Sequence, residues 1–225
     1  MGSEKFNYPI YVSLENKTCL VIGGGKIALR KTKSLLKANG AVTVIANHFL
    51  PDFYNLQKEV VSEDSKKSNL ILETRKFLPG DTKGFFLVFS ATDCSAVNKL
   101  VADEARANNI LSNIAENPCQ GSFVVPGRTK CGEIEFTVKT GSSPVLTKMI
   151  AKDIKKHYGS DLEEFRELIT TLREELKTLD TTTKERQEFW RTVITDQTFE
   201  KVTSGKIKEV KEIIEDAISC FRVKS

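Results

Sequence analysis

A glycine-rich loop near the start of the sequence has the residue types and spacing to hold a phosphate group. It consists of Gly23, Gly24, Gly25, Lys26 and Ile27, followed by Ala28. In this G-x-G-x-x-A pattern the first glycine permits a tight turn, and the second lets a pyrophosphate approach the backbone. The small last residue allows helix and strand to pack closely, and amides at the helix start face the phosphates. The loop therefore predicts a dinucleotide site, with a purely structural turn as the alternative.

The elements around the loop are those that such a site needs. Residues 18–22 form an apolar run typical of a buried parallel strand, and residues 27–39 have the pattern of a surface helix. Asn39-Gly40 is a common helix end, and residues 42–46 form a second strand. Together they predict a βαβ unit of about 30 residues.

The alternation of strands and helices continues beyond this unit. Strand patterns occupy residues 70–74, 85–89 and 110–114, and a helical pattern occupies residues 95–108. Such alternation predicts an α/β fold with a doubly wound parallel sheet.

A different pattern follows in the rest of the chain. Residues 122–126 and 133–139 flank a turn and predict a β-hairpin, which would either pair subunits or lie on the surface. From Ser143 onward, with Pro144 at the first helical position, the chain is expected to be helical. Apolar stripes along 162–179 and 207–221 predict a helical core.

The end of the second strand bears on the choice of dinucleotide. It carries no Asp or Glu for the ribose hydroxyls, although Asn47 has an amide that suits the same bonds. No Arg stands there for a 2′-phosphate, which favours NAD over NADP without settling the choice. His48 either lines the adenosine side or is an ordinary loop histidine.

Composition excludes several classes of function. The net charge of +4 over 225 residues is too small to indicate nucleic acid, and its basic excess lies in the first 150 residues. No apolar run reaches the roughly 20 residues that span a membrane, and no secretory leader opens the chain. The 5 cysteines lack metal or redox spacing, and with 2 histidines they offer no metal site. A reducing, cytoplasmic location is expected.

A series of motifs in order resembles one family. The motifs are Tyr8-Pro9-Ile10-Tyr11-Val12, the glycine loop with Arg30-Lys31, Ala91-Thr92-Asp93, Val97-Asn98, Asn113, Pro118, Ser122-Phe123-Val124-Val125-Pro126 and Ser142-Ser143-Pro144-Val145-Leu146. This order is similar to the precorrin-2 dehydrogenases of siroheme synthesis, including the amino-terminal module of siroheme synthases. The resemblance spans roughly residues 6–155 and continues loosely through the helical tail.

The resemblance implies a fold, an activity and an assembly. It implies a Rossmann domain at 1–113, a dimerisation segment containing the hairpin at 114–148, and a helical domain at 149–225. The implied reaction is NAD-dependent oxidation of precorrin-2 to sirohydrochlorin by a homodimer. Some family members also insert ferrous iron, and neither nucleic acid nor a membrane is an expected partner.

The resemblance also assigns site residues. The glycine loop, Asn47 and His48 match cofactor contacts, and Thr92 and Asp93 follow a strand at the edge where ligands bind, unless Asp93 caps the next helix. Glu116 stands where the family has an aspartate, and it is either the general base or a surface glutamate.

The expected tetrapyrrole is rich in carboxylates and needs cations and free amides. Ser142 and Ser143 open a helix and suit an anion, although this loop is one residue shorter than the usual family version. Arg128 is a substrate-binding candidate, as are Arg30, Lys31 and Lys130, and each is alternatively an ordinary solvated charge.

Three other functions remain open from the sequence. The chain is alternatively bifunctional, with sirohydrochlorin ferrochelatase activity, or a non-catalytic module that binds a dinucleotide or a tetrapyrrole. A dehydrogenase for an unrelated small molecule is disfavoured, because the usual catalytic His or Tyr-Lys pattern is missing.

Overall fold

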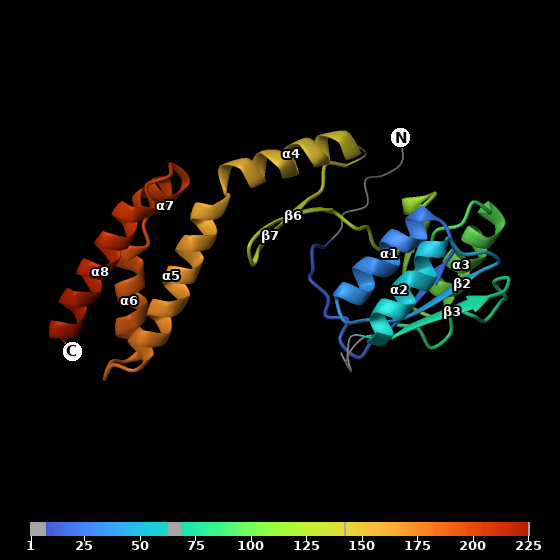
Figure 1. Cartoon of the computed structure of the whole chain (residues 1–225), viewed down its shortest axis with the longest axis horizontal. Coiled ribbons are helices and arrows are strands. Elements are labelled where there is room, and N and C mark those ends of the chain that lie inside the picture. The colour runs from blue at the N-terminus through green and yellow to red at the C-terminus, as the bar shows by residue number, and fades with distance from the viewer. Residues whose placement is uncertain (1–7, 63–68, 142, 225) are drawn as a thin grey trace. The chain divides into compact units, whose positions relative to one another are not determined.

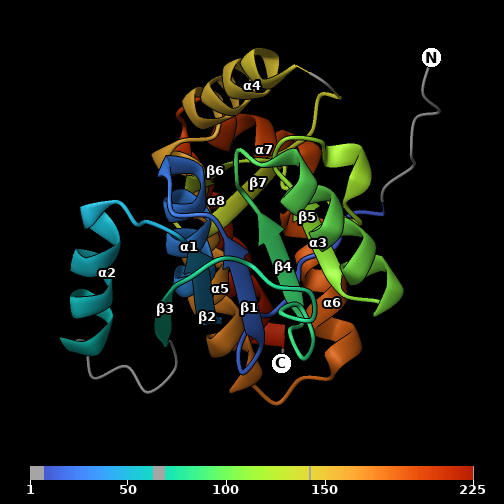
Figure 2. The ribbon, with the colours of Figure 1, turned by 90° about the vertical axis from the view of Figure 1, so that its right-hand side faces the viewer.

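In the computed structural model, which describes residues 8–62, 69–141 and 143–224, the apolar runs of the first half become parallel strands. The strands are β1 (Thr18–Ile22), β2 (Ala41–Ala46), β3 (Leu70–Thr74), β4 (Leu87–Ser90) and β5 (Leu111–Ile114). They form one sheet in the order β3-β2-β1-β4-β5, with every neighbouring pair parallel (Figure 2). The predicted doubly wound parallel sheet is therefore confirmed.

Helices cover both faces of this sheet. They are α1 (Lys26–Lys37), α2 (Pro51–Ser62) and α3 (Ser95–Ala107). Buried residues of α1 and α2 pack with Val21, Val44 and Phe89 on one face, and Val101 of α3 packs with Leu20 on the other. Successive β1 residues thus point to opposite faces, and both faces are buried, which is why the strand is apolar throughout.

The direction in which strands are added to the sheet reverses at β1. The chain adds β2 and β3 on one side of β1 and then returns to add β4 and β5 on the other. Ile22, Ser90 and Ile114 pair across β1, β4 and β5, so these strands end together. Ligands of such sheets bind at this switch point, outside the carboxyl ends of the strands.

Helix α2 was not among the predicted elements. It begins at Pro51, a residue suited to the first helical position, and it buries Phe53 and Leu56 in the sheet core. Tyr54 and Val61 are apolar but exposed, so the sequence of α2 lacks the simple apolar stripe by which a surface helix is predicted.

The second half of the chain opens with a two-stranded antiparallel hairpin. Its strands are β6 (Gly127–Cys131) and β7 (Ile134–Val138), and Gly127 pairs with Val138 (Figure 1). The turn contains Gly132 at φ +59°, the left-handed region that favours glycine. The hairpin predicted from the sequence is confirmed in kind.

The first hairpin strand lies five residues later than predicted. Residues 122–126 form no strand, because the backbone N–H of Ser122 donates to Ser112 O at 2.8 Å and ties the segment to β5. The Oγ of Ser122 also accepts from Ser112 N at 2.8 Å. Pro126 has no N–H for a ladder, so pairing with β7 begins only at Gly127.

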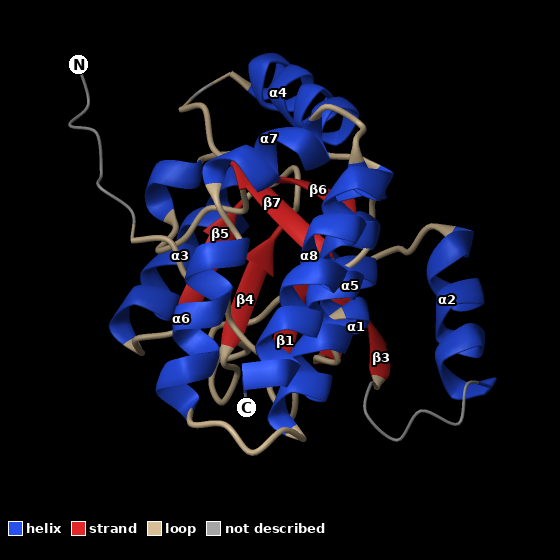
Figure 3. Cartoon of the chain, turned by 90° about the vertical axis from the view of Figure 1, so that its left-hand side faces the viewer, coloured by secondary structure: helices blue, strands red, loops and turns tan. Residues whose placement is uncertain are grey.

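The described residues that follow the hairpin are mostly helical (Figure 3). The helices are α4 (Pro144–His157), α5 (Ser160–Lys177), α6 (Thr183–Val193), α7 (Asp196–Thr203) and α8 (Ile207–Lys224). Helix α4 packs on the hairpin, and α8 packs against α5, α6 and α7. The predicted stripes supply the helical core, which includes Phe165, Leu172, Leu176, Val210 and Ile214. The predicted start of α4 is also confirmed, because Ser143 Oγ accepts from Leu146 N.

Contacts divide the chain into two units, Met1–Val125 and Pro126–Ser225. Residues 114–125 therefore belong to the unit that contains the sheet. The division into 1–113, 114–148 and 149–225 stays a prediction. None of the helices in the described ranges is long and apolar enough to cross a membrane.

Candidate functional site

The glycine loop lies between the carboxyl ends of β2 and β4, and its first two positions admit no side chain. Gly23 has φ +123°, and its N–H donates to Ile45 O at 2.9 Å. A Cβ at Gly23 would lie 2.3 Å from Ala91 O, and one at Gly24 would lie 1.8 Å from His48 O. Because those atoms are backbone, they cannot move aside without disturbing the sheet edge. The first two glycines are therefore required by the fold around the site.

The third glycine leaves room for a ligand. A Cβ at Gly25 would meet nothing within 4 Å, so this position opens to free space. Gly25 is the N-cap of α1, no side chain of the described residues caps it, and the first turn holds no acidic residue. The helix dipole and its first amides are thus available to an anion, and Ala28, fully buried, lets α1 approach the sheet. This uncapped, open helix start fits a pyrophosphate.

Lys26 and Ile27 begin α1, and both are exposed beside the open loop. Asn47 and His48 directly follow β2, and their side chains are exposed. The backbone carbonyl of His48 lies directly against Gly24, so the predicted adenosine-side residues are next to the loop. Their contacts with a cofactor stay a prediction.

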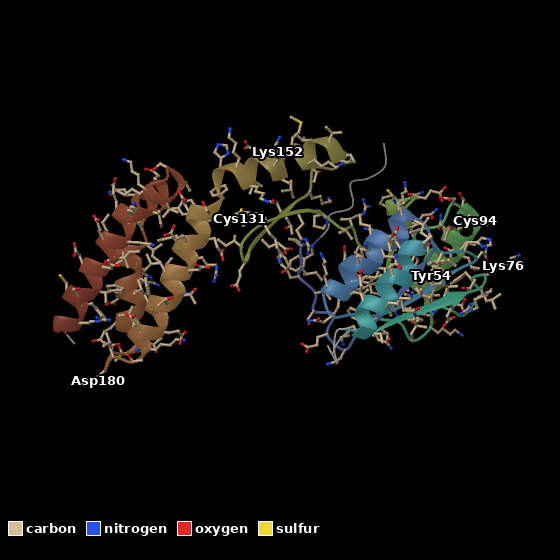
Figure 4. The ribbon with its side chains drawn as sticks, in the orientation of Figure 1. Tyr54, Lys76, Cys94, Cys131, Lys152 and Asp180 are labelled. Carbon is tan, nitrogen blue, oxygen red and sulfur yellow. The ribbon has the colours of Figure 1, made fainter. Side chains whose placement is uncertain are left out.

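Thr92 and Asp93 follow β4 at the same edge of the sheet. Thr92 Oγ1 accepts from Cys94 N at 3.0 Å and closes the turn into α3. The N-cap of α3 is Cys94, so the alternative that Asp93 caps this helix is wrong (Figure 4). The Asp93 side chain is exposed.

Glu116 lies two residues beyond β5 and is held by two short hydrogen bonds. Its Oε1 accepts from Ser95 Oγ at 2.6 Å, and its Oε2 accepts from Asn98 Nδ2 at 2.6 Å. These bonds, that from Ser95 first and that from Asn98 second, hold the pKa of Glu116 below its ordinary value. Glu116 is therefore an exposed, ionised and oriented carboxylate at neutral pH.

Asn98 is buried, and its orientation follows from its neighbours. Its Oδ1 accepts from Ser90 Oγ at 2.7 Å and from Thr92 Oγ1 at 3.1 Å. Its Nδ2 donates to Thr92 O at 3.0 Å as well as to Glu116. Reversing the amide would place its NH₂ against two hydroxyls and its oxygen against two acceptors, so the NH₂ must face the carboxylate.

Sequence reasoning missed Ser90, Ser95 and Asn98 as site residues. A signal was present, because residues three apart on a helix share a face, and Ser95 and Asn98 have this spacing. Their connection to Glu116 depends on the pairing of β4 with β5, which brings Ser90 beside Ile114.

Three of the predicted substrate-binding residues in the second unit, Arg128, Lys130 and Ser143, already have partners. Arg128 Nη1 lies 3.8 Å from Glu135 Oε2, and Lys130 Nζ lies 3.3 Å from the same oxygen. Ser143 caps α4, so its hydroxyl serves the helix start. Ser142 lies outside the described residues. A role in substrate binding stays a prediction for all of these residues.

The described ranges contain no group of three or more His, Cys, Asp or Glu side chains that could hold a metal ion.

Comparison with known proteins connects this geometry to a group of relatives. A family model described as "Putative NAD(P)-binding" matches residues 10–127. The siroheme synthase of Ruthia magnifica is 33% identical over 207 residues, which cover 91% of this chain and 42% of that protein. Siroheme synthase 1 of Yersinia pestis is 32% identical and is matched over 84% of this chain and 38% of its own length. The chain thus spans about two fifths of these relatives.

A solved structure shares the fold. SirC, a precorrin-2 dehydrogenase, superposes with a TM-score of 0.74 at 24% identity, covering 93% of this chain and all of that one. The resemblance that the ordered motifs indicated is confirmed by these relatives.

Proposed function

Because this chain belongs to the NAD(P)-binding family whose model matches residues 10–127, we propose that it is an NAD-dependent precorrin-2 dehydrogenase. It oxidises precorrin-2 to sirohydrochlorin in siroheme biosynthesis. The observation that carries this proposal is the oriented carboxylate of Glu116 at the sheet edge that also holds the glycine loop. The extended similarity to siroheme synthases supports the choice of substrate.

The reaction removes a hydride and a proton from the tetrapyrrole. The glycine loop would hold NAD, which would supply the acceptor for the hydride and its two electrons. The proton needs an acceptor, and Glu116 is ionised and exposed at neutral pH. Ser95 and Asn98 fix the direction of the carboxylate, and with one hydrogen bond to each oxygen from these donors both oxygens keep further acceptor capacity. In this proposal Glu116 is the general base.

The test is an anaerobic assay of NADH formation from NAD and precorrin-2. We expect the wild type to form NADH and sirohydrochlorin, and Glu116→Ala to lose turnover by about 100-fold or more while binding NAD unchanged. Glu116→Asp keeps the carboxylate, and Asp103→Ala removes an exposed carboxylate of α3 as the matched control.

Two results would count against the proposal. No NADH above an enzyme-free control would reject the dehydrogenase, and tight NAD binding without turnover would favour a non-catalytic binding module. Wild-type turnover in Glu116→Ala would remove Glu116 from the mechanism.

Insertion of ferrous iron into sirohydrochlorin is a second candidate function. It is favoured by the same carboxylate, since metal insertion displaces protons from the ring nitrogens and an ionised Glu116 can accept them. Here iron is a substrate. The rate of insertion with enzyme, compared with the spontaneous rate, decides the matter.

We also propose that the protein is a homodimer joined through α4. This helix has no buried residue in the single chain, and Val145, Leu146 and Met149 are 68%, 46% and 64% exposed. A bare apolar face of this kind suits a subunit interface. Light scattering should give a dimer for the wild type and a monomer for Met149→Lys. Lys152→Glu, which alters a polar position of α4 (Figure 4), should stay dimeric.

We further infer a preference for NAD over NADP and a cytoplasmic location. The segment after β2 offers Asn47 and His48 but no Arg or Lys for a 2′-phosphate. Cys19, Cys94, Cys131 and Cys220 are free thiols, which suits a reducing compartment. Titration with each dinucleotide tests the first inference: an equal or tighter Kd for NADP would reject it.

A further inference from the structure

Lys31 places an ammonium group against aromatic rings beside the carboxyl ends of β4 and β5. Its Nζ lies 4.8 Å from the centre of the Phe89 ring, and Phe89 is the last residue but one of β4. Phe123 packs edge-on against Phe89, with 5.4 Å between ring centres. Asn113 pairs with Phe89 across the strands, and its Nδ2 donates to Phe123 O at 3.0 Å. The surface behind the ammonium is therefore fixed by the sheet.

This ammonium is partly desolvated, and among the described residues no acidic side chain forms an ion pair with it. Phe89 and its neighbours Asn113 and Phe123 are uncharged. The neighbouring charge on its own helix is Arg30, which repels it. Burial, and to a smaller extent Arg30, lowers the pKa of Lys31 to about 8. By contrast, Arg128 and Lys130, two of the other predicted substrate cations, share Glu135.

The direction of the side chain places it on the ligand side of the fold. Long side chains on a helix point back toward its N-terminus, and Lys31 lies in the second turn of α1. Its ammonium lies over Phe89, one residue before the carboxyl end of β4, and is therefore close to the sheet edge where the glycine loop lies. The Lys31 ammonium lies on the side of β1 where β4 and β5 are found, whereas the predicted adenosine-side residues follow β2, on the other side of β1.

We propose that Lys31 binds an anionic oxygen group of a ligand at this edge, namely a substrate carboxylate or a dinucleotide phosphate. An ammonium that is partly removed from water gains most from a charged oxygen acceptor. The position beside β4 and β5, together with the separate anion site at the start of α1, favours the substrate carboxylate. The assignment to a substrate carboxylate rests on the proposed function, whereas the assignment to a dinucleotide phosphate does not.

The first experiment compares Lys31→Met with Lys33→Met, an exposed lysine on the same helix. The Kd for NAD is measured by titration, and the KM for precorrin-2 is measured by NADH formation. We expect Lys31→Met to raise one of these constants about tenfold, the loss of one charge-assisted hydrogen bond, and Lys33→Met to change neither. A raised KM with unchanged Kd identifies the carboxylate, and a raised Kd identifies the phosphate.

The second experiment uses the wild-type chain and needs no turnover. Lysines are acylated briefly with acetic anhydride, and the extent at Lys31 and Lys33 is read by mass spectrometry with NAD, precorrin-2 or neither present. We expect one ligand to protect Lys31 and neither to protect Lys33. If neither ligand protects Lys31 and Lys31→Met leaves both constants unchanged, the inference is overturned. Absence of NADH formation by the wild type would instead reject the proposed function, and the NAD titration and the protection measurements would still test Lys31.

Discussion

Replacing Lys31 by methionine should stabilise the unliganded first unit at neutral pH. Methionine keeps the length and packing of the side chain against Phe89 and removes a charge that forms no ion pair with any described acidic residue. A residue that is placed to bind a ligand lowers the stability of the protein while no ligand is bound.

The size of the effect follows from the pKa of Lys31. Its lowering from 10.5 to about 8 corresponds to roughly 3 kcal/mol between charged and neutral forms. Lys31 is only partly buried, so solvent screens the charge, and the contact with Phe89 offsets part of the cost. We expect Lys31→Met to raise the free energy of unfolding by about 1–2 kcal/mol at pH 7.

The pH dependence has a definite sign. Because the folded pKa of Lys31 lies below the unfolded value, the unfolded chain holds more protons between about pH 8 and pH 10.5. Wild-type stability relative to Lys31→Met therefore rises across this window. The advantage of the variant is complete below pH 8 and disappears as the pH approaches 10.5.

The assay must report on the correct unit. The single tryptophan, Trp190, lies in α6 and reports on the helical unit, so hydrogen exchange of β1 and β4 amides is the suitable measurement. Lys33→Met serves as the control. A variant that is less stable than the wild type at pH 7, or whose advantage does not change up to pH 10, would refute the reasoning.

Three further predictions concern the glycine loop, the carboxylate and the helical unit. Gly24→Ala should destabilise the first unit by more than about 2 kcal/mol, because its Cβ would overlap a carbonyl oxygen, whereas Gly25→Ala should fold normally and bind NAD more weakly, as measured by calorimetry. Ser95→Ala removes the hydrogen bond that contributes most to the low pKa of Glu116. The pKa of Glu116 should therefore rise, and the acid limb of the pH–rate profile should move to higher pH. Thr182→Ala breaks a capping box and should cost about 1 kcal/mol by tryptophan fluorescence.

Each of these has an outcome that would contradict it. Normal stability of Gly24→Ala would show that the loop is not confined by the neighbouring strands. An unchanged acid limb in Ser95→Ala would mean that Glu116 does not govern that limb. Equal stability of Thr182→Ala and the wild type would show that α6 begins without help from its cap.

Local patterns accounted for most of the fold. The strand, glycine loop and helix at residues 18–37 were predictable because side-chain period and glycine spacing act over a few residues. The start of α4 at Ser143-Pro144 was predictable for the same reason. The predicted first hairpin strand was misplaced, since Ser122 is held by Ser112, a residue ten positions away that no local pattern reveals.

What the sequence by itself determined is the kind of site: a dinucleotide loop, a parallel sheet to hold it, and a carboxylate at position 116. Only the tertiary structure decided which side chains hold that carboxylate and which lysine has a desolvated ammonium. The pairing of β4 with β5 joins Ser90, Asn98 and Glu116 into one network. The packing of α1 against Phe89 likewise desolvates the Lys31 ammonium, whereas the lysines around it stay solvated. This difference is not visible in the sequence, because desolvation depends on neighbours that are distant in sequence.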